Sequence, residues 1–494
     1  MTRNETIPYP NPLYSWYVVF VLLLAYILAF VDREIIALLV PDIKASLQIS
    51  DTQMSLLLGG AFAVFYTFFG VAIAWFADRG NRRWLLFWGV VFWSLMTAAC
   101  GFATSYAALF LARVGVGAGE SALNPSAMSI LKDYFPPDKI GRAIGLYTAG
   151  VSSGSGIAFI FGGAIYPKLK EIGPVELPLI GWHEPWQLMF IYVGLPGLLV
   201  ALLILTIKEP IRREFLVSGI KPIASPVNQT LAYLLKRWRA FLVLFFALSG
   251  LAIMAYGIGF WIPEFLRRTY NLTPEELGYW IQWRGVITIV FGLTGVLIGG
   301  FLSDWFQKRY EDGYVRVCLL AFVVMATGYC LFTLMPTPLL SVLFLIPATI
   351  GAAAPTAAGA AAVVAIAPPT MRAQVVAFYY FVLNAVGFFI GPTAVAMVTD
   401  LQGKATLADD PRKSELSILS EIKGNTRVQL HGNARAVVVY LQSGQEFEVK
   451  GPAVIVFGVQ QPEGITLMAD GRIAVVEVGT RRLLAVNPED GSKA

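Results

Sequence analysis

Four charged residues stand inside long apolar stretches of this sequence. Asp32 and Arg33 follow an uncharged run that begins at Leu13, and Arg113 and Glu120 lie in a second apolar stretch. A charged side chain at the centre of a bilayer costs roughly 2.5 to 3.5 kcal/mol on insertion scales, so such residues are kept mainly where they function. The pattern therefore predicts a site for protons or anions inside a membrane protein.

Asp32 and Arg33 allow two interpretations. Desolvation raises the pKa of a carboxyl group, whereas a neighbouring cation lowers it, so moving Arg33 onto a substrate anion would favour a proton on Asp32. Anion and proton would then compete for, or share, one electrostatic site. The alternative is a neutralised pair that only fixes helix packing. Because adjacent residues on a helix point about 100° apart, the two side chains can also serve different partners.

Arg113 and Glu120 are seven residues apart, which places them on one helix face about two turns from each other. At 1.5 Å per residue, Arg113 lies about 10 Å and Asp32 about 12 Å from the outer ends of their spans, so a contact between them is possible. Glu120 lies deeper, at about 20 Å, and is followed by Asn124 and by Pro125, whose missing N–H frees a carbonyl. We expect Glu120 to be a proton or substrate site, with a packing hydrogen bond as the alternative.

Further polar and aromatic residues in the apolar stretches are candidates to line a cavity, together with Arg33, Arg113 and Asn124. They are Tyr26, Tyr66, Tyr147, Tyr256, Trp261, Tyr379, Tyr380 and Asn384. More than half of them are expected to be packing or interfacial residues instead. Arg284, near the outer end of its span, could guide an anionic head group, but snorkelling to the interface is the preferred interpretation.

The composition indicates that these residues belong to a membrane protein with several spanning helices. Of the 494 residues, 56% are hydrophobic and 14% charged, and the mean hydropathy is +0.65. The net charge of +5 comes from short basic clusters between apolar runs, which argues against nucleic-acid binding. Three cysteines in apolar segments and two histidines predict no disulfide framework, metal site or cofactor. The membrane portion has no nucleotide-binding loop or nucleophile elbow, so we expect neither an enzyme nor ATP-driven transport.

Eleven segments meet the requirement of about 20 mostly apolar residues for a spanning helix. They lie near residues 13–39, 54–76, 84–104, 106–131, 142–166, 186–207, 240–265, 279–302, 314–335, 338–366 and 374–400. Lys and Arg gather in the loops after even-numbered spans, although Lys168, Lys170, Arg267 and Arg268 blur the contrast. The positive-inside rule therefore places the N-terminus and the connection at 208–239 in the cytoplasm. The first span follows no cleavage site and is expected to be retained.

The two halves repeat one another. Asp78-Arg79 with Arg82 and Arg83 recurs as Asp304 with Lys308 and Arg309, 226 residues later. Pro136-Pro137 followed by Arg142 recurs as Pro368-Pro369 followed by Arg372, at offsets of 232 and 230. This predicts a duplicated six-helix unit with parallel halves that rock about a site between them. The domains expected are an N-terminal half (1–207), a central loop (208–239), a C-terminal half (240–401) and a tail (402–494).

These motifs resemble the major facilitator superfamily. Its loop signature matches Asp78, Arg79, Arg82 and Arg83, with Ala74 in place of the usual glycine, and its fourth-helix signature looks like Arg113 to Gly119. FVDRE, ADRGNRR and GAGESALNPSA are most similar to the spinster-type lipid transporters and their bacterial relatives. The resemblance implies a bacterial inner membrane, a monomer, and a gate on the cytoplasmic side. The gating residues would be Asp78, Arg79, Arg82, Arg83, Asp304, Lys308 and Arg309, with topology determination alone as the alternative.

The tail departs from the family. The resemblance implies twelve helices, yet residues 402–419 are polar and the later apolar runs reach only about a third of a span. Polar and apolar residues alternate there with turn signals, which predicts strands. Residues 462–492 resemble one blade of a gluconolactonase-like β-propeller, and one or two blades cannot close a propeller. A fusion, truncation or assembly junction near 401–410 would explain the missing helix, and the chain as written need not be competent for transport.

The sequence therefore predicts an all-α membrane protein of the major facilitator fold with a short β-rich tail. Its expected function is proton-coupled secondary transport of an amphipathic anion, such as a lysophospholipid or sphingoid phosphate, by alternating access. Asp32 and Glu120 would couple protons, and the first half would carry the charged chemistry while the second half acts as a wall. A symporter or exporter of small organic anions, sugars or drugs is one alternative. A membrane-tethered propeller that binds a ligand or acts as a lactonase is the other.

Overall fold

The computed structural model describes the membrane portion and the strands of the tail. The described residues are 9–63, 66, 69, 73, 76, 80–136, 139–177, 181–212, 227–368, 371–402, 404–407, 427–431, 435–439, 446–450, 453–456, 462–467, 473–477 and 483–486. The chain falls into two compact units, residues 1–49 with 53–394 and residues 50–52 with 395–494. The first unit is a helical bundle, and the second begins inside the last long helix and continues into the tail.

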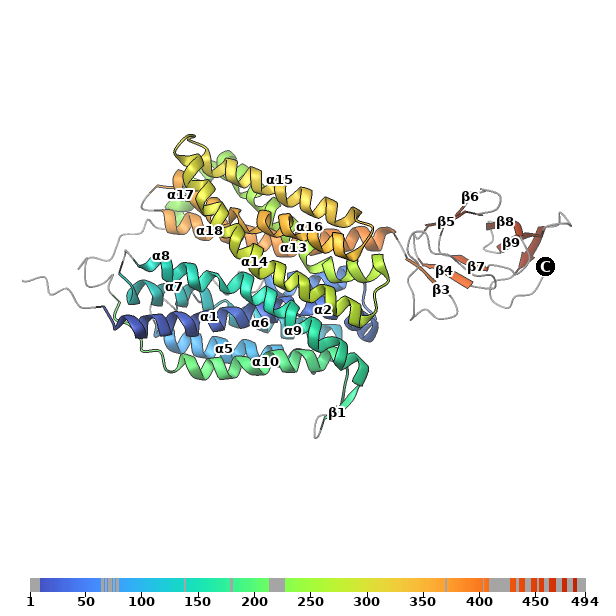
Figure 1. Ribbon diagram of the computed structural model, residues 1–494, viewed down its shortest axis with the longest axis horizontal. Coiled ribbons are helices and arrows are strands. Elements are labelled where there is room, and N and C mark those ends of the chain that lie inside the picture. Colours follow the sequence, from blue (N-terminus) through green and yellow to red (C-terminus); the bar gives the residue numbers. More distant parts are fainter. Residues whose placement is uncertain are drawn as a thin grey trace, which may run out of the picture. The chain divides into compact units, whose positions relative to one another are not determined.

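The first half of the bundle lies in the lower part of Figure 1, coloured blue to green. Its elements are α1 (Pro12–Glu34), α2 (Ile36–Leu47), α3 (Asp51–Ser55), the π-helical turn η1 (Leu56–Gly60), α5 (Arg82–Cys100), α6 (Tyr106–Glu120), α7 (Leu123–Tyr134), α8 (Ile140–Thr148), α9 (Gly150–Ile172) and α10 (Pro185–Ile204). A short antiparallel hairpin of β1 (Val175–Leu177) and β2 (Gly181–His183) joins the last two helices. Buried side chains that include Leu22, Trp93 and Tyr147 form its core.

The second half lies in the upper part of Figure 1. It consists of α12 (Val227–Lys236), α13 (Trp238–Tyr270), α14 (Pro274–Gln307), α15 (Gly313–Leu334), α16 (Pro338–Ala353), α17 (Pro355–Ile366) and α18 (Arg372–Gln402). Among the described residues, eight helical stretches are long and apolar enough to cross a membrane. The prediction of a helical membrane protein with two halves is confirmed. The first of these stretches continues to Leu47, beyond the predicted end at 39.

Polar residues at the helix starts explain where several spans begin. Thr273 and Glu276 form a capping box at the start of α14, with each side chain accepting a hydrogen bond from the backbone N–H of the other residue. Pro274 occupies the first helical position, where a missing N–H costs nothing. The side chains of Asn81 and Ser105 cap α5 and α6 in the same manner.

Four spans that the sequence suggested as continuous are interrupted. α1 and α2 separate at Ile35, α6 and α7 at Ser121 and Ala122, α8 and α9 at Ala149, and α16 and α17 at Ala354. Pro125 follows the second break and Pro355 the last, where the missing N–H of proline weakens the helical ladder. Pro355 comes 230 residues after Pro125, an offset that the sequence repeat shares. Interrupted helices therefore recur in both halves.

The described residues after Gln402 form strands and no helix. They are β3 (Lys404–Leu407), β4 (Arg427–His431), β5 (Arg435–Val439), β6 (Glu446–Lys450), β7 (Ala453–Val456), β8 (Pro462–Leu467), β9 (Ile473–Glu477) and β10 (Leu483–Val486). They pair antiparallel in the orders β3-β4-β7, β5-β6 and β10-β9-β8. The prediction of a β-rich tail is confirmed, and no twelfth helix is found in this part. The likeness to a propeller blade stays a prediction.

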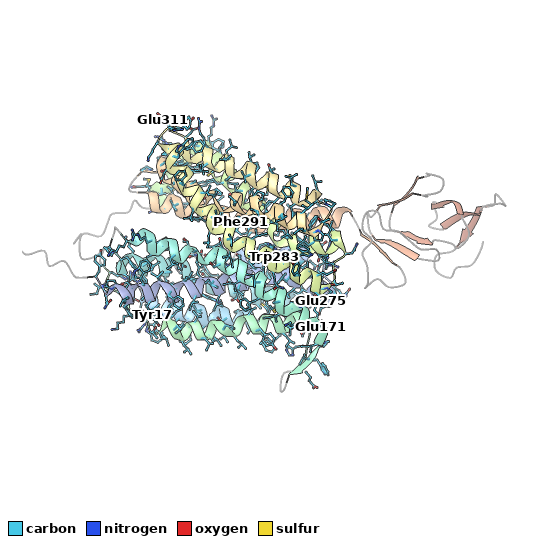
Figure 2. All side chains as sticks on the ribbon, viewed as in Figure 1. Tyr17, Glu171, Glu275, Trp283, Phe291 and Glu311 are labelled. Atoms are coloured by element: carbon cyan, nitrogen blue, oxygen red, sulfur yellow. The ribbon has the colours of Figure 1, made fainter. Side chains whose placement is uncertain are left out.

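The bundle has two distinct ends. The end where α5 begins carries Arg82, Arg83 and Lys308, and we call it the basic end. The opposite end, the far end, carries the hairpin and the connection between α13 and α14. Figure 2 places Glu171 and Glu275, which belong to different halves, together at the far end.

Glycines bring α9 and α14 into close contact toward the far end, and the two helices lie side by side in Figure 1. A Cβ added at Gly156 would lie 2.6 Å from the carbonyl oxygen of Gly285, and one at Gly163 would lie 2.6 Å from that of Gly278. Such backbone approach is open only to residues without a side chain. Toward the basic end, by contrast, a Cβ added at Gly300 would meet nothing within 4 Å. Among the described residues, these backbone contacts between α9 and α14 therefore lie in the part of α14 toward the far end.

Replacing Gly156→Ala should open this seam. The added methyl group would collide with the α14 backbone, and overpacking of this kind costs about 1 to 3 kcal/mol, or a factor of about 5 to 150 in population. We expect the arrangement with a closed far end to lose at least fivefold in population. Gly300→Ala is the matched control, because it makes the same change on α14 in open space.

Spin labels at Glu171→Cys and Glu275→Cys, in a Cys330→Ser background, measure this change, since both positions are exposed and lie on opposite halves. The distance between the labels should shift to longer values with Gly156→Ala and stay unchanged with the control. Identical distance distributions for the two variants would contradict the role of the seam.

Candidate functional site

Arg33 and Glu120 form a buried ion pair between α1 and α6. The guanidinium Nε lies 2.6 Å from the carboxylate Oε2, and the two side chains are 8% and 0% exposed. The rings of Phe30, Phe62 and Tyr66 face the same guanidinium, with its carbon 4.4 to 5.0 Å from their centroids. Aromatic faces stabilise a cation most when water is excluded. The pair therefore sits in a dry, aromatic environment.

Asp32 points to a different helix. Its Oδ2 accepts a hydrogen bond from the hydroxyl of Thr97 on α5, at 3.1 Å, and Asp32 is only 2% exposed. Arg113 reaches it as well, but the guanidinium donates to the backbone carbonyl of Asp32, at 3.1 Å, and not to the carboxylate. Among the described residues, Asp32 Oδ1, Glu120 Oε1 and Arg113 Nε have no hydrogen-bond partner. The cluster of Asp32, Arg33, Arg113 and Glu120 therefore keeps donor and acceptor atoms that a ligand or a proton could use.

Asn124 connects three tyrosines from separate helical segments beside this cluster. Its amide donates to the hydroxyls of Tyr26 at 3.4 Å and Tyr66 at 3.1 Å, and its oxygen accepts from Tyr147 at 2.7 Å. The rings of Tyr26 and Tyr147 stack with centroids 4.6 Å apart. Asn124 follows the break after Glu120 by only four residues, so the same interruption positions both. The geometry places four of the predicted site residues in one polar network.

The remaining predicted site residues lie in the second half. Tyr256 stacks on Phe388 with centroids 3.8 Å apart and lines a cavity described below. The indole of Trp261 donates to the carbonyl of Pro392 and so ties α13 to α18. Tyr379 is buried, and Asn384 is partly exposed. The described structure does not bring Trp261 or Tyr379 into contact with the Arg33–Glu120 pair.

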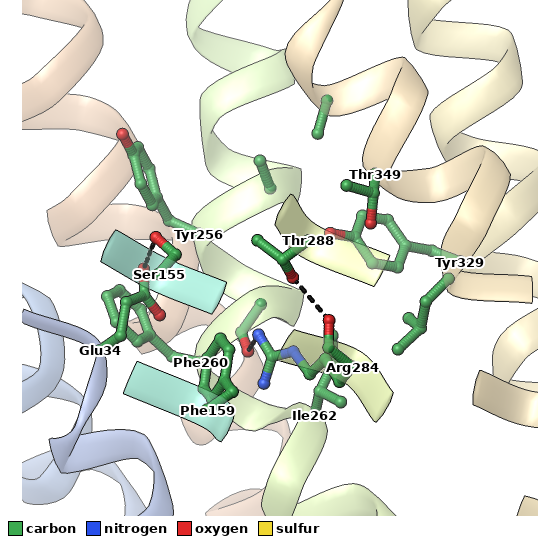
Figure 3. Close-up of a pocket in the computed structure, with 14 residues that line it drawn as sticks. Glu34, Ser155, Phe159, Tyr256, Phe260, Ile262, Arg284, Thr288, Tyr329 and Thr349 are labelled. Carbon is green, nitrogen blue, oxygen red and sulfur yellow. Dashed lines mark hydrogen bonds between the residues drawn. The ribbon is translucent and has the colours of Figure 1, made fainter. Parts of the chain in front are cut away.

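Arg284 was misjudged from the sequence, and the buried charges Glu34 and Glu264 were not predicted. Arg284 does not snorkel to an interface: it is 7% exposed, donates to the carbonyl of Gly259 at 2.8 Å, and lies over the ring of Phe159 at 3.8 Å. Glu34, next to Arg33, lines the same cavity as Arg284, as Figure 3 shows. The second half also buries Glu264, which pairs with two arginines of its own helix. Buried charge is therefore not confined to the first half.

Arg82 holds the basic end of the first half together. It is 1% exposed, and its guanidinium pairs with Asp133 at the end of α7 and with Glu209 after α10, at 2.5 and 2.7 Å. It also donates to the carbonyl of Pro210 and to the hydroxyl of Ser129. The neighbouring Arg83 contributes its backbone N–H to Glu209. Asp78 and Arg79 lie outside the described residues.

The repeated cluster in the second half has no comparable network. Asp304, Lys308 and Arg309 are exposed, and among the described residues no ion pair joins their side chains. Arg309 instead lies over the ring of Trp305, 4.1 Å from its centroid. In this arrangement the sequence repeat is not matched by a repeat of contacts.

A family model described as the Major Facilitator Superfamily matches residues 22–392. A crystal structure of a bacterial homologue of the human lysosomal transporter spinster, in an inward-facing and unoccupied conformation, superposes with a TM-score of 0.67. It is 30% identical, with 80% of this chain and 84% of that chain covered.

Two curated relatives are similar over much of their length. An MFS-type efflux pump of Mycolicibacterium smegmatis is 27% identical over 81% of this chain and 87% of its own length. A probable L-galactonate transporter of Escherichia coli is 24% identical over 66% of this chain and 70% of its own. The matched family region ends before the strands of the tail begin.

Replacing Arg82→Gln should destabilise the bundle, because Asp133 and Glu209 each lose an ion pair with its buried guanidinium. Removing one partner of a buried ion pair costs about 3 to 5 kcal/mol. Thermal unfolding of the purified protein in detergent measures this as a lower midpoint. Arg83→Gln is the matched control, since the contact of Arg83 with Glu209 uses the backbone and survives the change. Equal midpoints for the two variants would contradict the structural role of Arg82.

Proposed function

Because the chain belongs to the major facilitator superfamily, we propose that it is a proton-coupled secondary transporter of an amphipathic anion. The observation that carries the proposal is the buried Arg33–Glu120 pair with Asp32 and Arg113 beside it. A transporter of this superfamily has no need of four buried charges for packing alone, since each adds a desolvation cost. A proton and an anion supply a reason to keep them.

Charge balance supplies the coupling mechanism. With Asp32, Arg33, Arg113 and Glu120 all ionised, the cluster has no net charge. A proton on either carboxylate leaves one uncompensated positive charge in a dry environment, which is costly. A bound monovalent anion removes that cost by supplying the missing negative charge, and when the proton is on Glu120 the anion can pair with the released guanidinium of Arg33. Proton and anion thus favour each other at one site, and Asp32 and Glu120 are the proposed proton carriers.

The arrangement of the halves supports alternating access. The seam between α9 and α14 joins them toward the far end, and the matched spinster homologue is inward-facing. We propose that the basic end faces the cytoplasm of a bacterial inner membrane, in line with the positive-inside rule. The loop residues Asp78, Arg79, Arg82, Arg83, Asp304, Lys308 and Arg309 would meet across this end when it closes.

A second candidate substrate is a small sugar acid. The probable L-galactonate transporter of Escherichia coli favours it, because that relative is named for a carboxylate with several hydroxyl groups. The proposed proton and anion chemistry is common to both candidates. They differ in whether an acyl chain or a pattern of hydroxyl groups accounts for the rest of the binding.

Asp32→Asn and Glu120→Gln should uncouple transport from the proton gradient. Neither amide can carry a proton on and off, so we expect accumulation driven by a pH gradient to fall at least tenfold while exchange at equal pH is less affected. Flux into proteoliposomes, measured with and without a pH gradient, checks this. Glu171→Gln is a control, because Glu171 is an exposed carboxylate at the far end. Gradient-driven accumulation at the unmodified level in both variants would refute the proton role.

Competition profiles should separate the two candidate substrates. If the substrate is amphipathic, inhibition by lysophospholipids should strengthen with each added CH₂ group, by up to about 0.8 kcal/mol, until the chain exceeds the site. If it is a sugar acid, inhibition should instead depend on which hydroxyl groups are present, because unpaired polar groups in the site are penalised. Chain-length series and hydroxyl epimers assayed against one labelled substrate give the answer. Independence from acyl length would exclude the lipid candidate.

A further inference from the structure

A second charged site lies at the interface between the halves, apart from the Arg33–Glu120 pair. The described residues line a cavity of about 170 Å³ there. The first half contributes Glu34, Ser155 and Phe159 to its lining, and the second half contributes Tyr256, Arg284 and Thr288 among others. Figure 3 shows the carboxylate and the guanidinium approaching this space from different helices. The cavity is therefore built jointly by the two halves that must move during transport.

The guanidinium of Arg284 is fixed in an orientation that leaves N–H donors for an anion. Its Nη2 donates to the carbonyl of Gly259 at 2.8 Å, and the ring of Phe159 covers one face of the guanidinium. Its Nη1 has no hydrogen-bond partner among the described residues, although the side chain is 7% exposed. A fixed guanidinium presents its remaining N–H groups in the planar geometry that carboxylates and phosphates accept. A buried donor without a partner is costly, so an anion at this position is favoured.

Glu34 supplies the opposite charge across the cavity. Among the hydrogen bonds of the described residues, its Oε1 accepts a single long one, from the hydroxyl of Ser155 at 3.5 Å. The charges of Glu34 and Arg284 attract each other, yet among the described residues no ion pair within 4 Å joins them. An acceptor and a donor thus flank the space without satisfying each other. A ligand that carries an anionic group for Arg284 and a hydrogen-bond donor for Glu34 would satisfy both side chains.

We propose that Glu34 and Arg284 form a head-group subsite for the transported molecule. Arg284 binds the anionic group, and Glu34 accepts a hydrogen bond from an ammonium or hydroxyl group of the same head group. This inference rests on the proposed transport function and adds which groups the second half recognises. The volume supports a head group alone, because sites for whole drug-sized ligands usually measure about 300 to 1,000 Å³.

Glu34 lies next in sequence to Arg33, so the subsite adjoins the cluster of Asp32, Arg33, Arg113 and Glu120. Consecutive Cα atoms are about 3.8 Å apart, so Arg33 and Glu34 present their side chains from one point of the chain to the first half and to the interface. A head group in the cavity contacts α1 directly beside the Arg33–Glu120 pair. Binding at the interface is thereby placed next to the residues that exchange protons.

Two sources supply this head-group chemistry, and binding assays distinguish them. The probes are a labelled oleoyl lysophosphatidylethanolamine, with a phosphate and an ammonium, and L-galactonate, with a carboxylate and hydroxyls, each titrated onto the full chain in nanodiscs. Binding of the lysolipid points to a lipid head group, and binding of galactonate points to a sugar acid. Arg284→Gln should raise the Kd of the probe that binds at least tenfold, and Arg284→Lys should raise it less.

Glu34→Gln tests the other side of the subsite. It should weaken binding of the same probe at least threefold, but it should not weaken an anion of the same class whose head group lacks the donor, such as an oleoyl phosphate ester or a fatty carboxylate. Arg316→Gln is the matched control, because it removes an exposed arginine whose ion pair among the described residues is with Asp312, the residue directly before its own helix. Size-exclusion profiles and unfolding midpoints without ligand confirm that each variant is folded.

The outcomes separate this inference from the proposed function. If Arg284→Gln and Glu34→Gln both bind within twofold of the unmodified protein while Arg33→Gln loses binding, the subsite is wrong and the transport proposal stands. If the folded, unmodified protein binds neither probe, the substrate class fails and the subsite falls with it. Loss with Arg284→Gln, partial retention with Arg284→Lys and no change with Arg316→Gln support the subsite.

Discussion

The structure depends on balancing charge in an apolar bundle. Asp32, Arg33 and Glu34 are consecutive at the end of α1, and successive residues on a helix point about 100° apart. Each therefore meets a different element: Thr97 on α5, Glu120 on α6, and the cavity at the interface between the halves. Three charges in a row are tolerated because they never share a partner. One short segment of α1 therefore contacts α5, α6 and the cavity between the halves.

Helix interruptions place these charges where they can act. α1 ends directly after the three charges, and α6 ends at Glu120. A break frees backbone groups and lets the chain change direction, which membrane helices tolerate only where protein or a cavity surrounds them. The break at Ala354 in the second half has no acidic or basic neighbour. The duplicated unit thus kept its interruption while only one copy carries charge at it.

The fold and part of the site could be predicted from the sequence, and the remainder could not for physical reasons. Composition, span length and the repeated motifs led to the confirmed helical membrane fold. Depth along a helix indicated that Arg113 could reach Asp32, but not that the backbone carbonyl would be its partner. Arg284 was assigned to the interface because its span end was misplaced: α14 begins at Pro274, so Arg284 lies about 15 Å inside at 1.5 Å per residue. Glu34 carried no signal of its own, since its role comes from helices distant in sequence.

The contact between the halves must open during transport, whereas the buried ion pairs must stay formed. The structure places the two in different parts of the bundle. The ion pairs of Arg33 with Glu120 and of Arg82 with Asp133 and Glu209 each lie within one half. Between α9 and α14 the close contacts are made by glycine backbones. Single atomic contacts contribute only about 0.1 to 0.2 kcal/mol each, so such a seam can part gradually, whereas breaking a buried ion pair would cost about 3 to 5 kcal/mol at once. The halves can therefore rock without disrupting these ion pairs, and a ligand between Glu34 and Arg284 would add a direct polar link between the halves.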